Sequence, residues 1–108
     1  NNKTIIPQNS IKYTQKDGMK LVFTTDTRTY EVYNSFNKIS SILPKQFVRC
    51  HKSYIVNLDK IDNIDFSSNT IFFSNTDKCY IGPKYKNNFK EVFNYEYFTK
   101  DFGNVNNA

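Results

Sequence analysis

The sequence contains no tryptophan and little glycine, proline, cysteine or histidine. Its three glycines stand apart from one another, so no glycine-rich loop is present to cradle a phosphate group. One histidine and two cysteines without metal-type spacing do not supply the four ligands of a zinc site. The longest apolar runs, such as Tyr54-Ile55-Val56, span three residues, whereas a transmembrane helix needs about 20. We therefore expect neither a metal centre nor a membrane span.

Catalysis is also not expected. No carboxylate is spaced as a partner for His51, and Ser53 lacks the glycine-supported turn that presents a catalytic serine. These features predict a non-enzyme without cofactors or a small-molecule substrate. No secretory leader is visible at the N-terminus, which favours a cytoplasmic protein. Because the chain starts at Asn1, we expect a fragment of something longer.

The residues that are abundant favour β-sheet. Ile, Val and Thr together number 25, whereas Ala, Leu and Met together number five. Such β-branched side chains suit a pleated, half-buried surface and fit poorly on a helix. A nucleotide bias in the source genome is the competing explanation, since Asn, Lys, Ile, Phe and Tyr make up more than half of the chain.

The pattern of apolar residues predicts short antiparallel strands with two short helices. The first predicted strand, residues 11–13, is followed by a turn over residues 15–18. Further predicted strands cover 20–25, 29–33, 47–50, 53–56, 61–66, 70–74 and 78–81. Spacings of three and four at Phe36, Ile39 and Leu43 predict a helix between Asn34 and Leu43, capped by Asn34 or Ser35 and stopped by Pro44. A second helix is predicted around Tyr85 to Phe93.

We divide the chain into three segments. Residues 1–10 form a polar leader, residues 11–93 the folded domain, and residues 94–108 an aromatic C-terminal extension with a frayed tip. The aromatic residues of the extension are expected to dock on the domain; they are Tyr95, Tyr97, Phe98 and Phe102.

The charge is unevenly distributed along the chain. Residues 1–90 hold 14 basic and 7 acidic side chains, a net charge of +7, whereas residues 91–108 carry a net charge of −2. A basic body with an acidic end suits a polyanionic partner such as nucleic acid. The 18 aromatic residues leave a second hypothesis open, a β-rich protein–protein or RNA-binding module with exposed stacking platforms.

The two cysteines, Cys50 and Cys79, fall on separate predicted strands. One interpretation is a pair of reduced, partly buried thiols that behave as small hydrophobic side chains. The other is a redox pair that forms a reversible cross-strand disulfide under oxidation, and thereby switches the domain.

The most informative segment is residues 47–57, in which four polar residues stand between apolar runs: Arg49, His51, Lys52 and Ser53. A solvated strand edge would explain them, and so would a polar tip that contacts phosphates and base edges. The segment Phe47-x-Arg49-x-His51-Lys52-Ser53, followed by residues 54–57, closely resembles the signature of the LytTR DNA-binding domain. The resemblance extends from about Ile11 to Phe93 and is strongest to the quorum-sensing and virulence response regulators of two-component systems.

This resemblance implies a mainly β, elongated fold of about ten strands in three antiparallel sheets, with two short helices. It also implies a transcription regulator that reads the major grooves of double-stranded DNA with loops. Matched position by position, the family pattern places Met19, Lys52 and Lys84 at base edges. The residues it places near the DNA backbone are Lys20, Arg49, His51, Ser53, Tyr80 and Lys86.

The family further implies tandem direct-repeat sites, bound by a homodimer that forms through a missing N-terminal receiver domain. The sequence departs from the family pattern in the signature, where Lys52 replaces the usual arginine. It departs again in the last loop, where Gly82-Pro83 replaces a common serine–arginine pair. Lysine is a point charge rather than a bidentate donor to guanine, so we expect an altered base preference.

Overall fold

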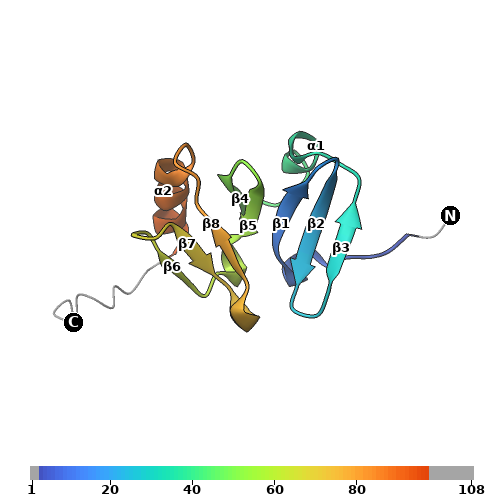
Figure 1. Cartoon of the computed structure of the whole chain (residues 1–108), viewed down its shortest axis with the longest axis horizontal. Coiled ribbons are helices and arrows are strands. Elements are labelled where there is room, and N and C mark those ends of the chain that lie inside the picture. The colour runs from blue at the N-terminus through green and yellow to red at the C-terminus, as the bar shows by residue number, and fades with distance from the viewer. Residues whose placement is uncertain (1–2, 98–108) are drawn as a thin grey trace.

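The computed structural model describes residues 3–97, which form two antiparallel sheets and two α-helices (Figure 1). The strands of the described part are β1 (Ile11–Asp17), β2 (Lys20–Thr25), β3 (Thr29–Val32), β4 (Phe47–His51), β5 (Tyr54–Asn57), β6 (Asn63–Asp65), β7 (Thr70–Phe72) and β8 (Lys78–Tyr80). The helices are α1 (Phe36–Ser40) and α2 (Lys86–Glu96), and single 3-10 turns cover Gln8–Ser10, Leu58–Lys60 and Ser74–Thr76.

The predicted mainly β class with two short helices is confirmed. The predicted count of about ten strands in three sheets differs from the described residues, which hold eight strands in two sheets. The reason is that β1 pairs with both β2 and β5. This pairing merges the first hairpin and the signature hairpin into one five-stranded sheet of order β3-β2-β1-β5-β4, beside a second sheet of order β6-β7-β8.

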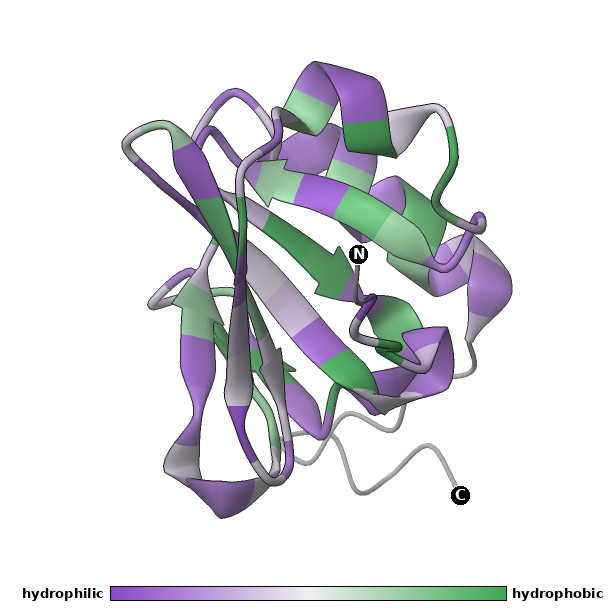
Figure 2. Cartoon of the chain, turned by 90° about the vertical axis from the view of Figure 1, so that its right-hand side faces the viewer, coloured by the Kyte–Doolittle hydropathy of each residue, from purple (hydrophilic) through white to green (hydrophobic). Residues whose placement is uncertain are grey.

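The five-stranded sheet has a hydrophobic core on each face. Consecutive residues of a strand point to opposite faces, so Ile55 of β5 enters one core and Val56 enters the other. The Ile55 core lies against α1, through Phe36 and Ile39. The Val56 core joins the second sheet and α2, whose Phe89 is fully buried. Figure 2 shows this arrangement as alternating apolar and polar residues along the strands, with mostly hydrophilic turns.

The first hairpin is longer than predicted. Strand β1 continues through Asp17, which pairs with Lys20, so the turn consists of Gly18 and Met19 alone. Gly18 has a φ of +64°, in the left-handed region that glycine adopts without strain. The polar residues before it were predicted to form the turn, but they pair with the start of β2 instead.

The helices follow their predicted signals but with different ends. Ser35 caps α1, as its hydroxyl oxygen accepts a hydrogen bond from the Lys38 amide, and the helix ends at Ser40, before Pro44. Helix α2 runs to Glu96, beyond the predicted end at Phe93. The predicted docking of Tyr95 is wrong, because its side chain lies on the outer face and is 88 % exposed. Tyr97 does pack against the core, stacking on Phe93.

The remaining aromatic residues of the extension, Phe98 and Phe102, and its predicted frayed tip lie outside the described residues. At the other end, Ile6 of the predicted leader packs against the core under α1. The division into leader, domain and extension stays a prediction.

A buried lysine links the two sheets at the end of β1 opposite the Gly18 turn. The ammonium of Lys12, 1 % exposed, lies 2.8 Å from Asp77 Oδ2 and 3.2 Å from Asp26 Oδ1, and it donates to the Ser74 carbonyl. The Ser74 hydroxyl donates to Asp26 in turn. We call these four residues the Lys12 cluster. Burial lowers the pKa of Lys12, but the hydrogen bonds and charges of both aspartates outweigh it and raise the pKa above its ordinary value.

Candidate nucleic-acid interface

Three turns that are distant in sequence meet at one end of the sheets. They are residues 18–19 between β1 and β2, residues 52–53 between β4 and β5, and residues 81–85 between β8 and α2 (Figure 1). The Lys16 amide donates to the Ser53 carbonyl at 2.9 Å, and the Gly82 amide donates to the Cys50 carbonyl at 2.8 Å. Backbone hydrogen bonds therefore hold the three turns in a fixed relation. We call them together the loop edge.

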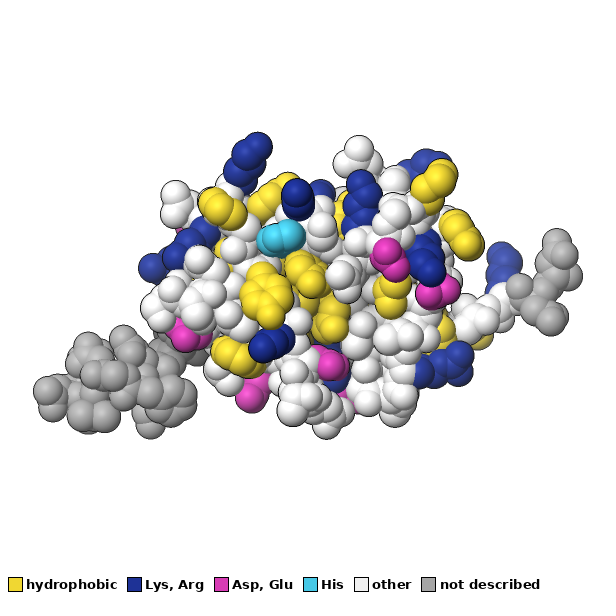
Figure 3. Space-filling model, in the orientation of Figure 1, with side chains coloured by type: hydrophobic (Ala, Val, Ile, Leu, Met, Phe, Trp, Pro, Cys, Tyr) yellow, Lys and Arg dark blue, Asp and Glu magenta, His cyan; other side chains and the backbone are white. Residues whose placement is uncertain are grey.

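The loop edge is basic. Figure 3 shows Lys and Arg side chains along the upper margin of the molecule, over these turns, with the acidic side chains below them. Lys52 and Lys84 are exposed, and the ion pairs formed within residues 3–97 involve only Lys12 and Lys20 as cations. Met19 projects with 87 % of its surface exposed. The three residues predicted to contact bases thus lie on three turns of one edge, with their side chains open to solvent.

Arg49 makes hydrogen bonds within the protein, and its predicted contact with the DNA backbone stays a prediction. Its Nε donates to the His51 carbonyl at 2.8 Å, and its Nη2 donates to the Lys52 carbonyl. The guanidinium also lies 4.6 Å from the ring centre of Phe36 and 5.4 Å from that of Tyr85. Arg49 therefore supports the turn that displays Lys52, at a point where the register of β4 with β5 shifts between Arg49 and His51.

His51 and Ser53 are bonded to each other. The Ser53 amide donates to His51 Nδ1 at 3.0 Å, so the neutral ring carries its proton on Nε2. Partial burial lowers the pKa of His51 below its ordinary value, and the charges of Lys52 and Arg49 lower it further. The ring is therefore neutral at pH 7 and can donate one hydrogen bond from Nε2.

Three other residues predicted to contact the DNA backbone differ in whether their side chains already bond within the protein. Lys20 pairs with Glu31 at 2.8 Å, an exposed pair that keeps the pKa of Lys20 above its ordinary value through that hydrogen bond. Lys86 donates to the Phe66 carbonyl at 3.0 Å, which ties the start of α2 to the strand β6 region. Tyr80 is 44 % exposed beside the third turn.

Gly82 contributes to the packing of the loop edge, which the sequence comparison with the family pattern does not predict. A Cβ at this position would lie 3.3 Å from His51 Cδ2 and 3.4 Å from Tyr85 Cδ2. The absence of a side chain lets the third turn pack directly against the signature turn. A glycine after a strand signals such a close approach, but only the fold shows which partner it meets.

The two cysteines lie directly beneath the loop edge. Both are free thiols with no exposed surface, in the core that contains Val56 and Phe89. Burial raises the pKa of Cys50 to about 12 and raises that of Cys79 as well. The reactive thiolate is therefore rare at neutral pH. The disulfide switch stays a prediction.

Within residues 3–97, no three His, Cys, Asp or Glu side chains gather as potential metal ligands. No helix in that range has the length and apolarity to cross a membrane.

The chain is similar in sequence to a protein family and to several known proteins. Residues 1–94 match the model of a protein family described as the LytTr DNA-binding domain. Accessory gene regulator protein A of Staphylococcus aureus is 34 % identical over 61 residues, and that of Staphylococcus epidermidis is 30 % identical over 61 residues. Each alignment covers 56 % of this chain and 25 % of the relative, so the matched region spans about a quarter of their length.

The fold is also similar to a solved structure. A LytTr DNA-binding domain from Bacillus cereus superimposes with a TM-score of 0.74 at 25 % sequence identity, covering 81 % of this chain and 84 % of that one.

Proposed function

This chain belongs to the LytTR family of DNA-binding domains, and from that membership we propose that it is the sequence-specific, double-stranded DNA-binding output domain of a response-regulator transcription factor. The observation that carries this proposal is the loop edge itself. Three turns, fixed to one another by backbone hydrogen bonds, expose Met19, Lys52 and Lys84 along one edge, and the two lysines form none of the ion pairs within residues 3–97.

Each of the three side chains suits a major-groove contact. Lysine ammonium groups donate to guanine O6 and N7, and an apolar side chain such as Met19 packs against the thymine methyl group. The neutral His51 ring can donate from Nε2 to a phosphate oxygen, and Lys20, Ser53, Tyr80 and Lys86 line the same region. Arg49 contributes through the turn that it supports, with its remaining guanidinium face toward the backbone.

The whole regulator would act in the cytoplasm as a homodimer. We propose that a receiver domain before this chain brings two copies together on tandem direct repeats, as in two-component quorum-sensing and virulence regulators. Linking two modest binding events in this way raises the overall affinity without any new contact. A duplex with two repeats should then bind an artificially dimerised chain far more tightly than a duplex with one repeat, whereas the monomeric chain should bind each repeat independently.

The test starts from a random duplex pool, from which the chain selects its preferred site. Fluorescence anisotropy on that site then compares Lys52→Ala and Lys84→Ala with Lys78→Ala, an exposed lysine at the far end of β8. Loss of a base contact should weaken binding by about 1–3 kcal/mol, roughly 5- to 150-fold, and should relax the preference at one base pair. Unchanged affinity in both variants, with selection intact, would overturn the residue assignment.

An RNA- or protein-binding module is the alternative that the aromatic content raised. Tyr33 and Tyr95 are 83 % and 88 % exposed, but the large aromatic side chains Phe23, Phe36, Phe73 and Phe89 are buried in the two cores. A parallel titration with single-stranded RNA separates the two functions. Tighter binding to RNA than to the selected duplex, at equal salt, would replace the DNA proposal.

A further inference from the structure

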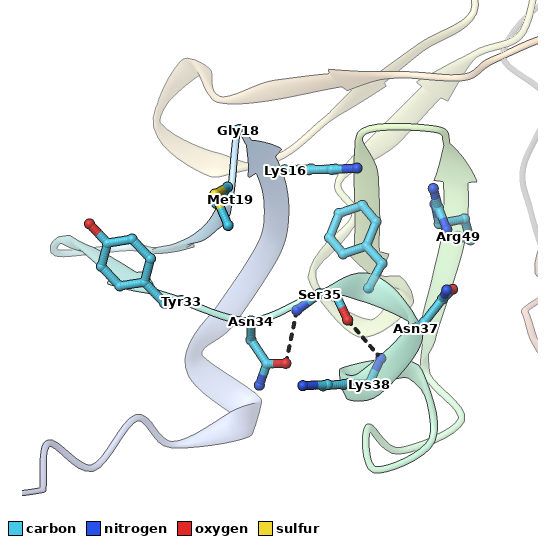
Figure 4. Close-up of a pocket in the computed structure, with 10 residues that line it drawn as sticks. Lys16, Gly18, Met19, Tyr33, Asn34, Ser35, Asn37, Lys38 and Arg49 are labelled. Atoms are coloured by element: carbon cyan, nitrogen blue, oxygen red, sulfur yellow. Dashed lines mark hydrogen bonds between the residues drawn. The ribbon is translucent and has the colours of Figure 1, made fainter.

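A groove lies beside the loop edge, between the Gly18 turn and α1. It has a volume of about 700 Å³, and its walls come from the end of β1, the segment after β3, the first turn of α1, and β4. Figure 4 shows Lys16 extending from β1 toward the strand that carries Arg49, with Met19 and Tyr33 on the other side of the view. None of the residues that line it is acidic.

The charged wall of the groove holds three cations: Lys16, Lys38 and Arg49. Lys16 and Lys38 are exposed and make none of the ion pairs found within residues 3–97. Arg49 is half-buried over Phe36, a ring that is 4 % exposed and forms the floor. Three positive charges around one hollow repel one another unless an anion neutralises them.

The opposite wall is apolar at its rim. Met19 and Tyr33 are 87 % and 83 % exposed, although their side chains are large and hydrophobic. A cationic wall facing an apolar rim matches the two sides of a nucleic-acid strand, in which charged phosphates alternate with less polar sugars. Short polar groups between the walls, at Asn34, Ser35 and Asn37, add hydrogen-bonding capacity.

We propose that this groove is a second DNA-binding site, which holds the phosphodiester backbone next to the base pairs contacted by the loop edge. The proposal rests on the proposed function and extends it to Lys16 and Lys38, which the signature does not include. Continuity with the loop edge favours DNA over an acidic protein segment, because Met19 belongs to both surfaces and Arg49 in the groove donates to the Lys52 carbonyl of the loop edge. A strand lying on the Gly18 turn would therefore enter the groove.

The test uses the whole chain and the selected duplex, and measures binding from 0.05 to 0.3 M salt for wild type, Lys16→Gln/Lys38→Gln and Lys45→Gln/Lys78→Gln. The control lysines are exposed and stand at the starts of β4 and β8, away from the loop edge. Each lost phosphate contact should reduce the slope of log K against log salt by about 0.9. The slope of the groove variant should therefore be smaller by about 1.8, and its affinity at 0.1 M salt should be roughly 60-fold lower. The loss should be equal on a non-selected duplex, and Lys16→Arg/Lys38→Arg should retain wild-type binding.

The outcomes separate the two proposals. Wild-type binding with an unchanged slope in the groove variant overturns the groove assignment and leaves the proposed function standing. A loss confined to the selected sequence also overturns it, since a backbone contact carries no sequence preference. Loss of binding to a poly-glutamate peptide, with DNA binding intact, would assign the groove to a protein partner instead. No wild-type binding to any duplex would refute the proposed function itself.

Discussion

The loop edge and the Lys12 cluster lie at opposite ends of strand β1, and both contain lysines, but they use the charge in opposite ways. At the Lys12 cluster the ammonium is 1 % exposed and contacts two aspartates and a carbonyl. At the loop edge Lys52 and Lys84 are exposed and no carboxylate of the described residues lies within ion-pairing distance of them. The first lysine stabilises the contact between sheets, and the others remain available to a partner.

The backbone differs between the two ends as well. At the loop edge the left-handed conformation falls on Gly18, which adopts it freely. Near the Lys12 cluster it falls on Asn75 and on the β-branched Thr76, at φ values of +58° and +66°. Such a conformation is costly for threonine, and the bonds of Lys12 to Ser74 and Asp77 on either side hold it in place. The Lys12 cluster thus offsets the backbone strain at Thr76, whereas the Gly18 turn of the loop edge has no such strain.

The reactivity of Cys50 and Cys79 measures how well the loop edge shields the core below it from solvent. Because burial raises the pKa of Cys50 from 9.0 to about 12, its thiolate at pH 8 should be about a thousandfold rarer than that of a free cysteine. Reaction with a chromogenic disulfide reagent should be slower by the same factor in the native chain and fast in denaturant. Measuring Cys50→Ser and Cys79→Ser separately assigns the rate to one thiol, and rapid native labelling would show that the edge opens.

Oxidation of Cys50 and Cys79 tests whether they form a disulfide that switches DNA binding. Diamide treatment should leave DNA affinity unchanged relative to Cys50→Ser, because two buried, protonated thiols have little access to the oxidant. A fall in affinity seen only when both cysteines are present, and reversed by a reductant, would instead establish a disulfide switch.

Lys12→Met tests the stabilising lysine. Removing it leaves two carboxylates facing each other between the sheets, and since both are partly solvated we expect a loss of about 2 kcal/mol in the free energy of unfolding. Lys20→Met is the matched control near the loop edge, because it breaks only the exposed pair with Glu31, which solvent screens, and should therefore cost clearly less than Lys12→Met. Urea denaturation gives both values. Equal losses would remove the distinction between the two ends.

Arg49→Lys tests whether the loop edge depends on internal support. Lysine lacks the planar group whose separate nitrogens donate to the His51 and Lys52 carbonyls and whose face packs on Phe36, so the turn that displays Lys52 should loosen. We expect DNA affinity to fall about tenfold, near 1.4 kcal/mol, with little change in the salt slope because the charge is kept. The opposite result would be wild-type DNA affinity for Arg49→Lys together with a salt slope smaller by about 1 for Arg49→Gln. Arg49 would then be a simple phosphate contact.

The smallest expected effect is a pH dependence of the free energy of unfolding, in which the loop edge and the Lys12 cluster titrate in different pH ranges. The pKa of His51 is lowered by burial, so its contribution to stability is present above about pH 6.5 and is lost as the pH falls below it. The pKa of Asp26 is lowered by its hydrogen bonds to Ser74 and Lys12, so its contribution is lost only below about pH 4. His51→Gln should remove the first phase of a stability–pH profile and Asp26→Asn the second. A profile that neither variant changes would refute both assignments.

Local patterns predicted much of the fold. The strand at Lys20–Thr25, the Ser35 cap of α1 and the apolar stripe of α2 each depend on neighbours within a few positions, and the structure contains them. Family resemblance added the site, because it placed three turns at one edge. That placement depends on pairings such as β1 with β5, which join residues about 40 positions apart.

Long-range contacts explain what could not be predicted. Lys12 stands 65 positions before Asp77, so nothing nearby marks it as a buried, paired lysine. The hydrogen bonds of Arg49 to the His51 and Lys52 carbonyls form at a register shift between β4 and β5, which no residue in the sequence marks. Lys16 and Lys38 line one groove only in the folded chain, where β1, α1 and β4 all contribute to its walls. Each case needs the assembled fold.

The hydrogen bonds that link the three turns of the loop edge to one another join main-chain atoms: the Lys16 amide donates to the Ser53 carbonyl, and the Gly82 amide to the Cys50 carbonyl. Such bonds do not depend on which side chains occupy positions 19, 52 and 84. The residues proposed to contact bases can therefore be exchanged without refolding the scaffold, and under the proposed function single substitutions at these positions would be enough to change operator preference.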